Sequence, residues 1–313
     1  MRRARSEYAD IMRELAARAG DDELNDAHVT AADALQVFAL PQAPEGCVFE
    51  EHVFGRGGDH RLDLFLYRPA DTSEPHPAIV FVHGGGLRSG FPEMHGWQAA
   101  ALAAAGYVSA SIDYRVFPET TWPGALEDVK CAVRWLRAHA TALGVDSARI
   151  AVVGGSAGGY LAALLALTPG LYEGDGGQPE EASAVSAAVL FYPLTDMSWP
   201  SLAPDVQQLV ADFLGGDDQQ VYREGSPATY VKEGAPPFLI LTGDRDREVP
   251  VEMVRAFHEQ LLEAGVESTL HVFSGAAHAF DYALPAWHET FALASSFLNE
   301  RLAPSTVAHA QSE

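Results

Sequence analysis

A serine within a glycine-rich stretch has the clearest potential for chemistry in this sequence. The stretch is Gly154-Gly155-Ser156-Ala157-Gly158-Gly159, between an apolar run at residues 150–153 and a helical stretch at residues 160–168. A G-x-S-x-G between a strand and a helix holds its serine on a tight turn, where the hydroxyl can reach a substrate. Side chains at 154 and 158 would obstruct the neighbouring chain, so glycine suits both positions. The pattern predicts Ser156 as a nucleophile; the alternative is a turn that only joins a strand to a helix.

A second glycine-rich segment, His83-Gly84-Gly85-Gly86, directly follows an apolar run at residues 78–82. Consecutive glycines leave backbone N–H groups unobstructed, and such groups can stabilise the oxyanion that forms when a nucleophile attacks a carbonyl. We therefore predict that Gly84, Gly85 and Ala157 form an oxyanion hole. In this interpretation His83 and Gly86 support the loop, and the alternative is an ordinary flexible loop.

A serine hydroxyl is a weak nucleophile until a base removes its proton, so a histidine is required on a later loop. His278 lies in a loop of small residues, 274–280, directly after the apolar run at residues 269–273. A side chain on such a loop can reach across the edge of a sheet. We expect packing or surface roles for several other histidines. His258 and His288 lie in segments whose apolar residues recur at helical spacing, and polar neighbours surround His60, His76, His95 and His139. The sequence predicts His278 as the base.

The base in turn needs a carboxylate that holds its tautomer and stabilises the imidazolium. Three candidates follow the apolar run at residues 238–241, namely Asp244, Asp246 and Glu248. Their spacing leaves the choice among them open. Whichever of them is chosen, the residues follow one another along the chain as serine, carboxylate and histidine, which is the order expected of an α/β-hydrolase.

Eight short apolar runs, most of them separated by helical stripes, must position these side chains. The first two resemble an antiparallel hairpin, and the later ones alternate with helices, which is typical of a parallel sheet covered on both faces. The runs are 47–54, 62–68, 78–82, 107–112, 150–153, 187–191, 238–241 and 269–273. The sequence therefore predicts an α/β-hydrolase fold with a mostly parallel eight-stranded sheet flanked by helices.

Three segments fall outside this alternation. Residues 1–45 contain a helical stripe and predict an N-terminal helical extension, which either packs on the core or forms part of a cap. Residues 46–303 form the predicted catalytic domain, and its insertion at about 195–235 carries one more stripe, from Val206 to Leu214, that predicts a small helical cap. The last ten residues, 304–313, predict a frayed tail.

Composition limits the partners that we expect. The chain has 48% hydrophobic residues, enough for a globular core, and a net charge of −23 from 20 basic and 43 acidic residues, which repels phosphate backbones. We therefore expect no nucleic acid partner. Cys47 and Cys131 form neither a disulfide framework nor a metal-binding spacing. We expect neither a metal nor an organic cofactor.

No apolar run is long enough for a convincing membrane span. Acidic residues at positions 7, 10 and 14 interrupt the region where a secretion signal would be apolar. The sequence therefore predicts a cytoplasmic protein. It leaves the oligomeric state open, with a homodimer among the options.

Together these residues resemble the hormone-sensitive-lipase-like esterases and, more closely, the bacterial feruloyl-esterase-like (BD-FAE) carboxylesterases, from about residue 49 to residue 298. In that branch a strand is followed by G-x-x-D-x-x-V-P, which Gly243, Asp246, Val249 and Pro250 match. The resemblance thus implies that Asp246 is the acid. Residues 113–119 are similar to the family's D-Y-R-x-x-P-E element, which implies that Asp113 supports the oxyanion loop without transferring protons.

The resemblance implies a serine carboxylesterase that acts on a small-molecule ester through an acyl-enzyme. The small cap favours short- to medium-chain acyl groups. Gly155 stands where the lipase-like enzymes usually have Asp, and Leu87 where the feruloyl-esterase-like branch often has Trp, so acyl preference does not follow from the family. Two alternatives remain open: acyl transfer or amide or formamide hydrolysis in a biosynthetic pathway, and a non-catalytic ligand-binding homologue.

Overall fold

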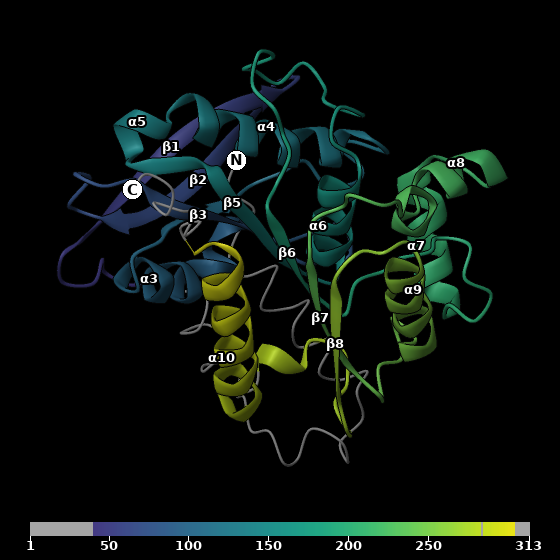
Figure 1. The fold of residues 1–313 in the computed structure, drawn as a ribbon. Coiled ribbons are helices and arrows are strands. Elements are labelled where there is room, and N and C mark those ends of the chain that lie inside the picture. The colour runs from purple at the N-terminus through teal and green to yellow at the C-terminus, as the bar shows by residue number, and fades with distance from the viewer. Residues whose placement is uncertain (1–39, 283, 304–313) are drawn as a thin grey trace, which may run out of the picture.

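The computed structural model describes residues 40–282 and 284–303, and an eight-stranded sheet runs through its centre (Figure 1). The predicted N-terminal extension, apart from residues 40–45, and the predicted tail at 304–313 lie outside the described residues. In chain order the strands are β1 (Cys47–Gly57), β2 (His60–Pro69), β3 (His76–Val82), β4 (Val108–Ile112), β5 (Val145–Gly155), β6 (Ala187–Phe191), β7 (Phe238–Gly243) and β8 (Ser268–Phe273).

The lateral order of the strands is β1-β2-β4-β3-β5-β6-β7-β8. β2 pairs antiparallel with both β1 and β4, and every other pair is parallel. An antiparallel hairpin followed by parallel strands is what the sequence predicts, and the α/β-hydrolase fold is confirmed.

Helices cover both faces of the sheet. The helices α3 (Gly96–Ala104) and α10 (Leu284–Arg301) lie on one face, and α4 (Gly124–Ala138), α6 (Ala157–Leu167) and α9 (Val251–Glu263) lie on the other. The remaining helical elements are α5 (Ala140–Leu143), α7 (Pro204–Leu214), α8 (Gln219–Glu224) and the 3-10 helices η1 (Pro92–His95), η2 (Pro227–Tyr230) and η3 (Phe280–Tyr282).

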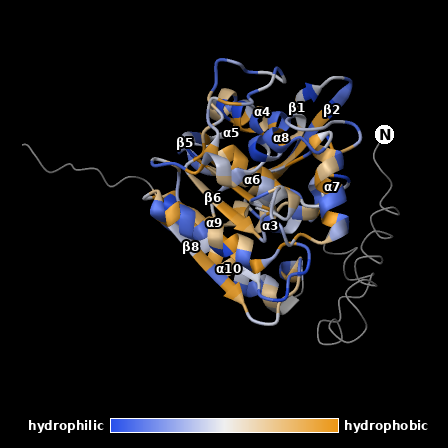
Figure 2. Cartoon of the chain, turned by 90° about the vertical axis from the view of Figure 1, so that its right-hand side faces the viewer, coloured by the Kyte–Doolittle hydropathy of each residue, from blue (hydrophilic) through white to orange (hydrophobic). Residues whose placement is uncertain are grey.

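Continuous apolar runs form the central strands because both faces of these strands are buried. In β3 the side chains of Ala78, Val80 and Val82 enter one core cluster, while those of Ile79 and Phe81 enter the other. Figure 2 shows the hydrophobic colours along the strands inside the molecule and the hydrophilic ones mainly at its periphery. The sheet is therefore a rigid, doubly covered support for the loops at its edges.

A reversal of strand order lies at β3, which has β4 on one side and β5 on the other. The chain leaves β3 towards one side and later returns on the other side. The loops after β3 and β5 therefore diverge at their carboxyl ends, which is where open α/β sheets bind ligands. The loop after β3 carries the three consecutive glycines, and the turn after β5 carries Ser156.

The segment between β6 and β7 contains α7, α8 and η2. The predicted apolar stripe forms α7, which begins with Pro204 and is followed by Gly215 in the left-handed conformation. Both residues suit these ends, because proline tolerates the first helical position and glycine the positive φ of +80°. The Asp218 side chain caps α8 by accepting a hydrogen bond from the N–H of Gln220.

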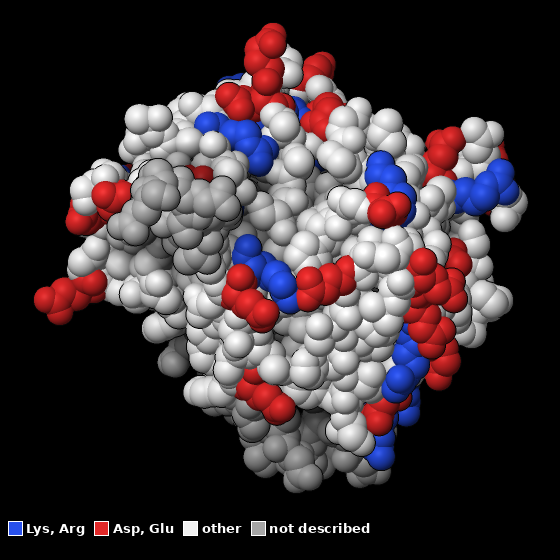
Figure 3. All heavy atoms as spheres, in the orientation of Figure 1, with Lys and Arg blue, Asp and Glu red and all other residues white. Residues whose placement is uncertain are grey.

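Charged side chains of both signs are interspersed on the face drawn in Figure 3, and the described part of that face has no broad basic area. This arrangement agrees with the acidic net charge of −23. Within residues 40–303, residue 283 excepted, no helix is both long and apolar enough to cross a membrane.

Candidate active site

Ser156 occupies a sharp turn between β5 and α6. Its backbone has φ +55° and ψ −121°, a combination that non-glycine residues rarely adopt. The N–H of Ser156 donates to the carbonyl of Phe191 at 2.9 Å, which ties the turn to the end of the neighbouring strand β6. Strain of this kind persists only where the surrounding structure enforces it, and it is concentrated at functional sites.

The glycines that flank Ser156 are required by close backbone contacts. A β-carbon on Gly154 would lie 2.3 Å from the carbonyl oxygen of Gly158, and one on Gly158 would lie 2.0 Å from the carbonyl oxygen of Val82. Both distances are far inside van der Waals contact with backbone atoms that cannot move aside. The start of α6 can therefore approach the ends of β5 and β3 only because these residues lack side chains.

The structure brings together the three predicted residues Ser156, His278 and Asp246. The Oγ of Ser156 lies 2.8 Å from His278 Nε2, and His278 Nδ1 lies 2.7 Å from Asp246 Oδ2. The Asp246 side chain is fully buried, and its Oδ1 accepts hydrogen bonds from the N–H groups of Glu248 and Val249 at 2.9 and 2.8 Å. These contacts fix the carboxylate so that its other oxygen faces the imidazole.

The other two candidate carboxylates occupy different places. Asp244 is exposed, and its Oδ1 accepts the N–H of Gly275 at 2.6 Å, so it holds the loop that carries His278. Glu248 lies on the side of the other ring nitrogen, with 3.7 Å between its Oε2 and His278 Nε2, and its side chain is 41% exposed. Only Asp246 contacts His278 Nδ1.

The charges around His278 favour its protonated form. Burial lowers the pKa of His278, but the charge of Asp246 and its hydrogen bond to the imidazole outweigh burial, with further contributions from Glu248 and Asp281, and raise the pKa to about 9. An imidazolium that forms when His278 accepts a proton is thus stabilised by three carboxyl groups.

The glycine loop after β3 lies against the serine turn. A β-carbon on Gly84 would lie 2.9 Å from the carbonyl oxygen of Gly155 and 3.5 Å from Cβ of Ser156. Gly85 and Gly86 have φ angles of +119° and +60°, and the Gly85 carbonyl accepts the N–H of Ser89 at 3.1 Å. The loop therefore folds back on itself beside Ser156, where its N–H groups can face a bound carbonyl.

His83 supports this loop from inside the protein. Its Nδ1–H donates to the Gly84 carbonyl at 2.9 Å, and its ring stacks on Tyr114 at 4.1 Å between centroids. The hydroxyl of Tyr114 donates to the His83 carbonyl at 2.7 Å. Burial lowers the pKa of His83, so the imidazole is neutral and shapes the loop.

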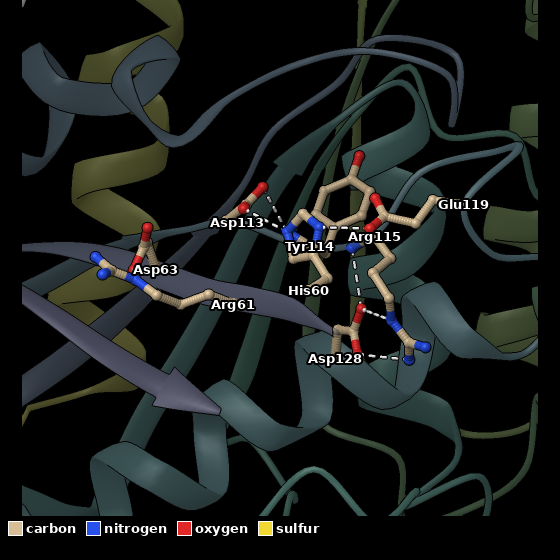
Figure 4. Close-up of polar contacts among 8 residues, drawn as sticks. All are labelled: His60, Arg61, Asp63, Asp113, Tyr114, Arg115, Glu119 and Asp128. Atoms are coloured by element: carbon tan, nitrogen blue, oxygen red, sulfur yellow. Dashed lines mark hydrogen bonds and ion pairs between the residues drawn. The ribbon is translucent and has the colours of Figure 1, made fainter. Parts of the chain in front are cut away.

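A polar cluster on the outer side holds the segment that carries Tyr114 (Figure 4). Asp113 accepts the N–H of Tyr114 at 3.0 Å and contacts His60 Nε2 at 2.9 Å, while His60 Nδ1 lies 2.8 Å from Glu119. The support expected of Asp113 therefore acts through Tyr114. Sequence reasoning missed His60, because its two carboxyl partners become neighbours only when β2 pairs with β4.

Two further residues near His278 were also missed. The Tyr192 ring lies 4.6 Å from the His278 ring, and its hydroxyl donates to Asp281. Neither belongs to a recognisable motif. The three-residue spacing between His278 and Asp281 was the one signal in the sequence that could have drawn attention to the pair.

The helix α7 lies over the glycine loop. The Arg88 guanidinium pairs with Asp212 on α7, and a β-carbon on Gly86 would lie 3.7 Å from the methyl groups of Leu209. Helix α7 therefore borders the region in front of Ser156. That the insertion forms a cap stays a prediction.

A strained serine between a strand and a helix, at the reversal point of a mostly parallel sheet, is the arrangement of the α/β-hydrolases, and this chain is one of them. Comparison with known families shows to which family of α/β-hydrolases the chain belongs. The chain belongs to the BD-FAE family, whose model matches residues 62–261. The family predicted from the sequence is confirmed.

Similar proteins are esterases. The chain is 33% identical to the probable carboxylic ester hydrolase LipM of Mycobacterium tuberculosis over 72% of its length, and it spans about half of that relative, 54%. It is 32% identical to the ethyl acetate hydrolase of Pseudomonas putida, covering 75% of this chain and 76% of that protein. Among solved structures, the propionate-bound esterase Est2 of Thermogutta terrifontis is similar with a TM-score of 0.72 and 36% identity, over 84% of this chain and 98% of that one.

Proposed function

We propose that this protein is a serine carboxylesterase that hydrolyses esters of short- to medium-chain carboxylic acids through an acyl-enzyme. The observation that carries the proposal is the continuous series of hydrogen bonds from Ser156 through His278 to Asp246, with distances of 2.8 and 2.7 Å. A base within hydrogen-bond reach of the hydroxyl, oriented in turn by a buried carboxylate, is the geometry that activates a serine nucleophile.

In the proposed reaction Ser156 Oγ attacks the ester carbonyl while His278 Nε2 accepts its proton. The imidazolium then gives the proton to the leaving alkoxide. A water molecule next attacks the acyl-enzyme with His278 again acting as base, and the imidazolium returns the proton to Ser156 Oγ as the carboxylic acid leaves. The buried Asp246 keeps the proton of the neutral imidazole on Nδ1, so that Nε2 is free to accept. The chain's own side chains thus account for each proton transfer.

The negative charge that develops on the carbonyl oxygen needs donors. We assign this role to the N–H groups of Gly84, Gly85 and Ala157. The close packing of Gly84 against Gly155 and Ser156 supports this assignment, and so does the position of Ala157 at the N-terminus of α6, where the helix dipole favours negative charge.

The preference for small acyl groups rests on two observations. The insertion between β6 and β7 contributes only two short helices and a 3-10 turn, and Leu209 on one of them approaches the glycine loop. The Est2 structures include complexes with propionate and with butyrate, and the Pseudomonas relative is named for ethyl acetate.

The test is the initial rate of hydrolysis of p-nitrophenyl esters from acetate to palmitate. We expect rates to be highest for the short chains and to fall by about 10³-fold or more in Ser156→Ala and His278→Ala. The matched controls are Ser186→Ala and His258→Ala, and both should keep the wild-type rate. Ser186 directly precedes β6, at the end away from Ser156, and His258 lies on α9.

A fluorophosphonate probe followed by peptide mass analysis identifies the nucleophile independently of the substrate. Labelling is expected at Ser156 and should disappear in the alanine variant. A folded wild-type protein that neither hydrolyses any ester of the series nor reacts with the probe would rule out the proposed activity.

A further inference from the structure

Tyr192 lies where the serine turn meets the histidine loop. It is the first residue after β6, its N–H donates to the carbonyl of Leu241 at 2.7 Å, and its φ is +35°. The carbonyl of the preceding residue, Phe191, accepts the N–H of Ser156. The backbone of Tyr192 is therefore connected to the nucleophile turn on one side and to β7 on the other.

The side chain of Tyr192 contacts the proposed base. Its ring centroid lies 4.6 Å from that of His278, with the planes inclined by 59°, and only 1% of the residue is exposed. A β-carbon on Gly155 would lie 3.2 Å from the Tyr192 hydroxyl. The ring thus fills the space between the residue before the nucleophile and the imidazole.

The hydroxyl of Tyr192 is held by Asp281, three residues after His278 on η3. It donates to Asp281 Oδ1, and Asp281 is only 8% exposed. This bond fixes the far end of the loop that carries His278 to the end of β6. Side chains from other segments therefore hold the loop along its length: Asp244 at Gly275, Asp246 at His278 and Tyr192 at Asp281.

The buried Tyr192–Asp281 pair is an energetically unfavourable way to stabilise a fold. Burial raises the pKa of Asp281 to about 6, although the hydrogen bond from Tyr192 and the charge of His278 oppose this shift. Apolar residues of similar volume generally fill a buried site at least as favourably as a buried charge does. A carboxyl group here, beside the proposed base, indicates a role in the chemistry of the site.

We propose that Tyr192 and Asp281 are positioning residues for His278, which hold the imidazole in the orientation that faces Ser156. The inference rests on the proposed esterase function. Tyr192 restrains the ring by contact, and Asp281 restrains Tyr192. When ionised, Asp281 is also an additional negative charge that stabilises the imidazolium formed during proton transfer.

Several titratable groups face this pair. Asp246 and Glu248, on the loop after β7, and Asp281, on η3, act on His278, and Tyr282 on η3 acts on Tyr192. On the other side, Asp281 lines a small cavity between the sheet and helices α3 and α10, which His95 of η1 also lines. Burial, together with the nearby His83, lowers the pKa of His95 to about 3, so its imidazole is neutral above pH 5 and adds no charge there.

The experiment compares Tyr192→Phe, Asp281→Asn and the double variant with Tyr107→Phe. Tyr107→Phe is the control, because the hydroxyl of Tyr107 also donates to a side chain, that of Asn299. Tyr107 lies on the same face of the sheet as Tyr192. We expect kcat to fall by roughly tenfold in each single variant with KM within about twofold, and the double variant to lose little more because the two residues act as a unit.

A change in the pH dependence distinguishes positioning from general destabilisation. Loss of the Asp281 charge should lower the pKa of His278 and move the acid limb of kcat/KM to lower pH by roughly half a unit to one unit. An NMR titration of histidine ring signals, assigned with His278→Gln, follows the same pKa without any turnover. The control should match wild type in both measurements.

The proposal is overturned if Asp281→Asn leaves the His278 titration unchanged, or if Tyr192→Phe keeps the wild-type kcat. Loss of activity in proportion to a lowered melting temperature, with an unshifted pH profile, also overturns it. Failure of the esterase function gives a different pattern, in which wild type itself hydrolyses no ester while the NMR titration still reports on the Tyr192–Asp281 pair.

Discussion

Replacement of Asp246 by asparagine should reverse the tautomer of His278. The carboxylate uses Oδ1 to accept two backbone N–H groups, from Glu248 and Val249, and Oδ2 to face His278 Nδ1. An asparagine must keep its carbonyl oxygen towards the two N–H donors, because its NH₂ group would oppose them. Its NH₂ group then faces Nδ1, which must act as acceptor, and the ring proton moves to Nε2.

The magnitude follows from this change. With a proton on Nε2, the imidazole donates towards Ser156 Oγ and cannot accept the hydroxyl proton at the present distance of 2.8 Å. Where a buried triad carboxylate is replaced by its amide with the geometry preserved, kcat falls by about 10⁴-fold. We therefore expect a loss of about 10³- to 10⁴-fold, or about 4 to 5.5 kcal/mol of transition-state stabilisation.

The assay is kcat and KM for p-nitrophenyl acetate at pH 9, with Asp244→Asn as the matched control. Asp244 is exposed and accepts a single N–H from Gly275, a bond that asparagine keeps, so the control should lose less than about threefold. The reasoning is refuted if Asp246→Asn keeps more than about a tenth of the wild-type kcat, or if the two variants lose activity equally.

Three more predictions concern pH and packing. Because the pKa of His278 is raised to about 9, kcat/KM should rise steeply between pH 7 and 9 and level off above that, and a plateau starting near pH 6.5 contradicts this expectation. The hydrogen bond with Asp113 raises the pKa of His60 from 6.5 to about 9, so its stabilising effect is full below pH 6.5 and is lost as the pH rises through 9. Wild type should therefore exceed His60→Asn in melting temperature at pH 6 and match it at pH 10, and an equal difference at both values argues against this coupling. Gly158→Ala places a β-carbon 2.0 Å from the Val82 carbonyl and should lower the melting temperature by roughly 2 to 10 °C and abolish fluorophosphonate labelling, whereas unchanged melting shows that the contact relaxes freely.

The strands of the sheet could be predicted from the sequence because the pattern that indicates each strand lies within a few consecutive residues. Each inner strand is a short apolar run bounded by turn residues, and burial on both faces makes such runs continuous. The same holds for the serine turn, since the requirement for glycine at 154 and 158 comes from backbone atoms of adjacent elements. The N-terminal stripe gave an equally local signal, but it lies outside the described residues, and its part in a cap stays a prediction.

The remaining site residues depend on contacts that spacing does not encode. Asp244 and Asp246 are two residues apart on one loop, and only the direction of the backbone N–H groups of Glu248 and Val249 determines which carboxylate faces His278. Tyr192 and Asp281 are 89 residues apart and meet because β6 and the histidine loop end at the same edge of the sheet. Residue types alone therefore identify neither the Asp246–His278 pair nor the Tyr192–Asp281 pair, because both pairs depend on how the strands align in the sheet.

The strain at Ser156 connects the stability of the fold to the proposed chemistry. A non-glycine residue in such a conformation costs on the order of 1 to 3 kcal/mol, and the surrounding structure must offset that cost. Here the restraints come from three adjacent strands: β5 carries the serine, β6 accepts its N–H through Phe191, and the end of β3 packs against the first turn of α6 at Gly158. We expect a change at any of these contacts to let the serine relax and to move its hydroxyl away from His278. Activity should therefore be lost before global unfolding when these backbone contacts are perturbed, because the strained conformation of Ser156 depends on all three strands at once.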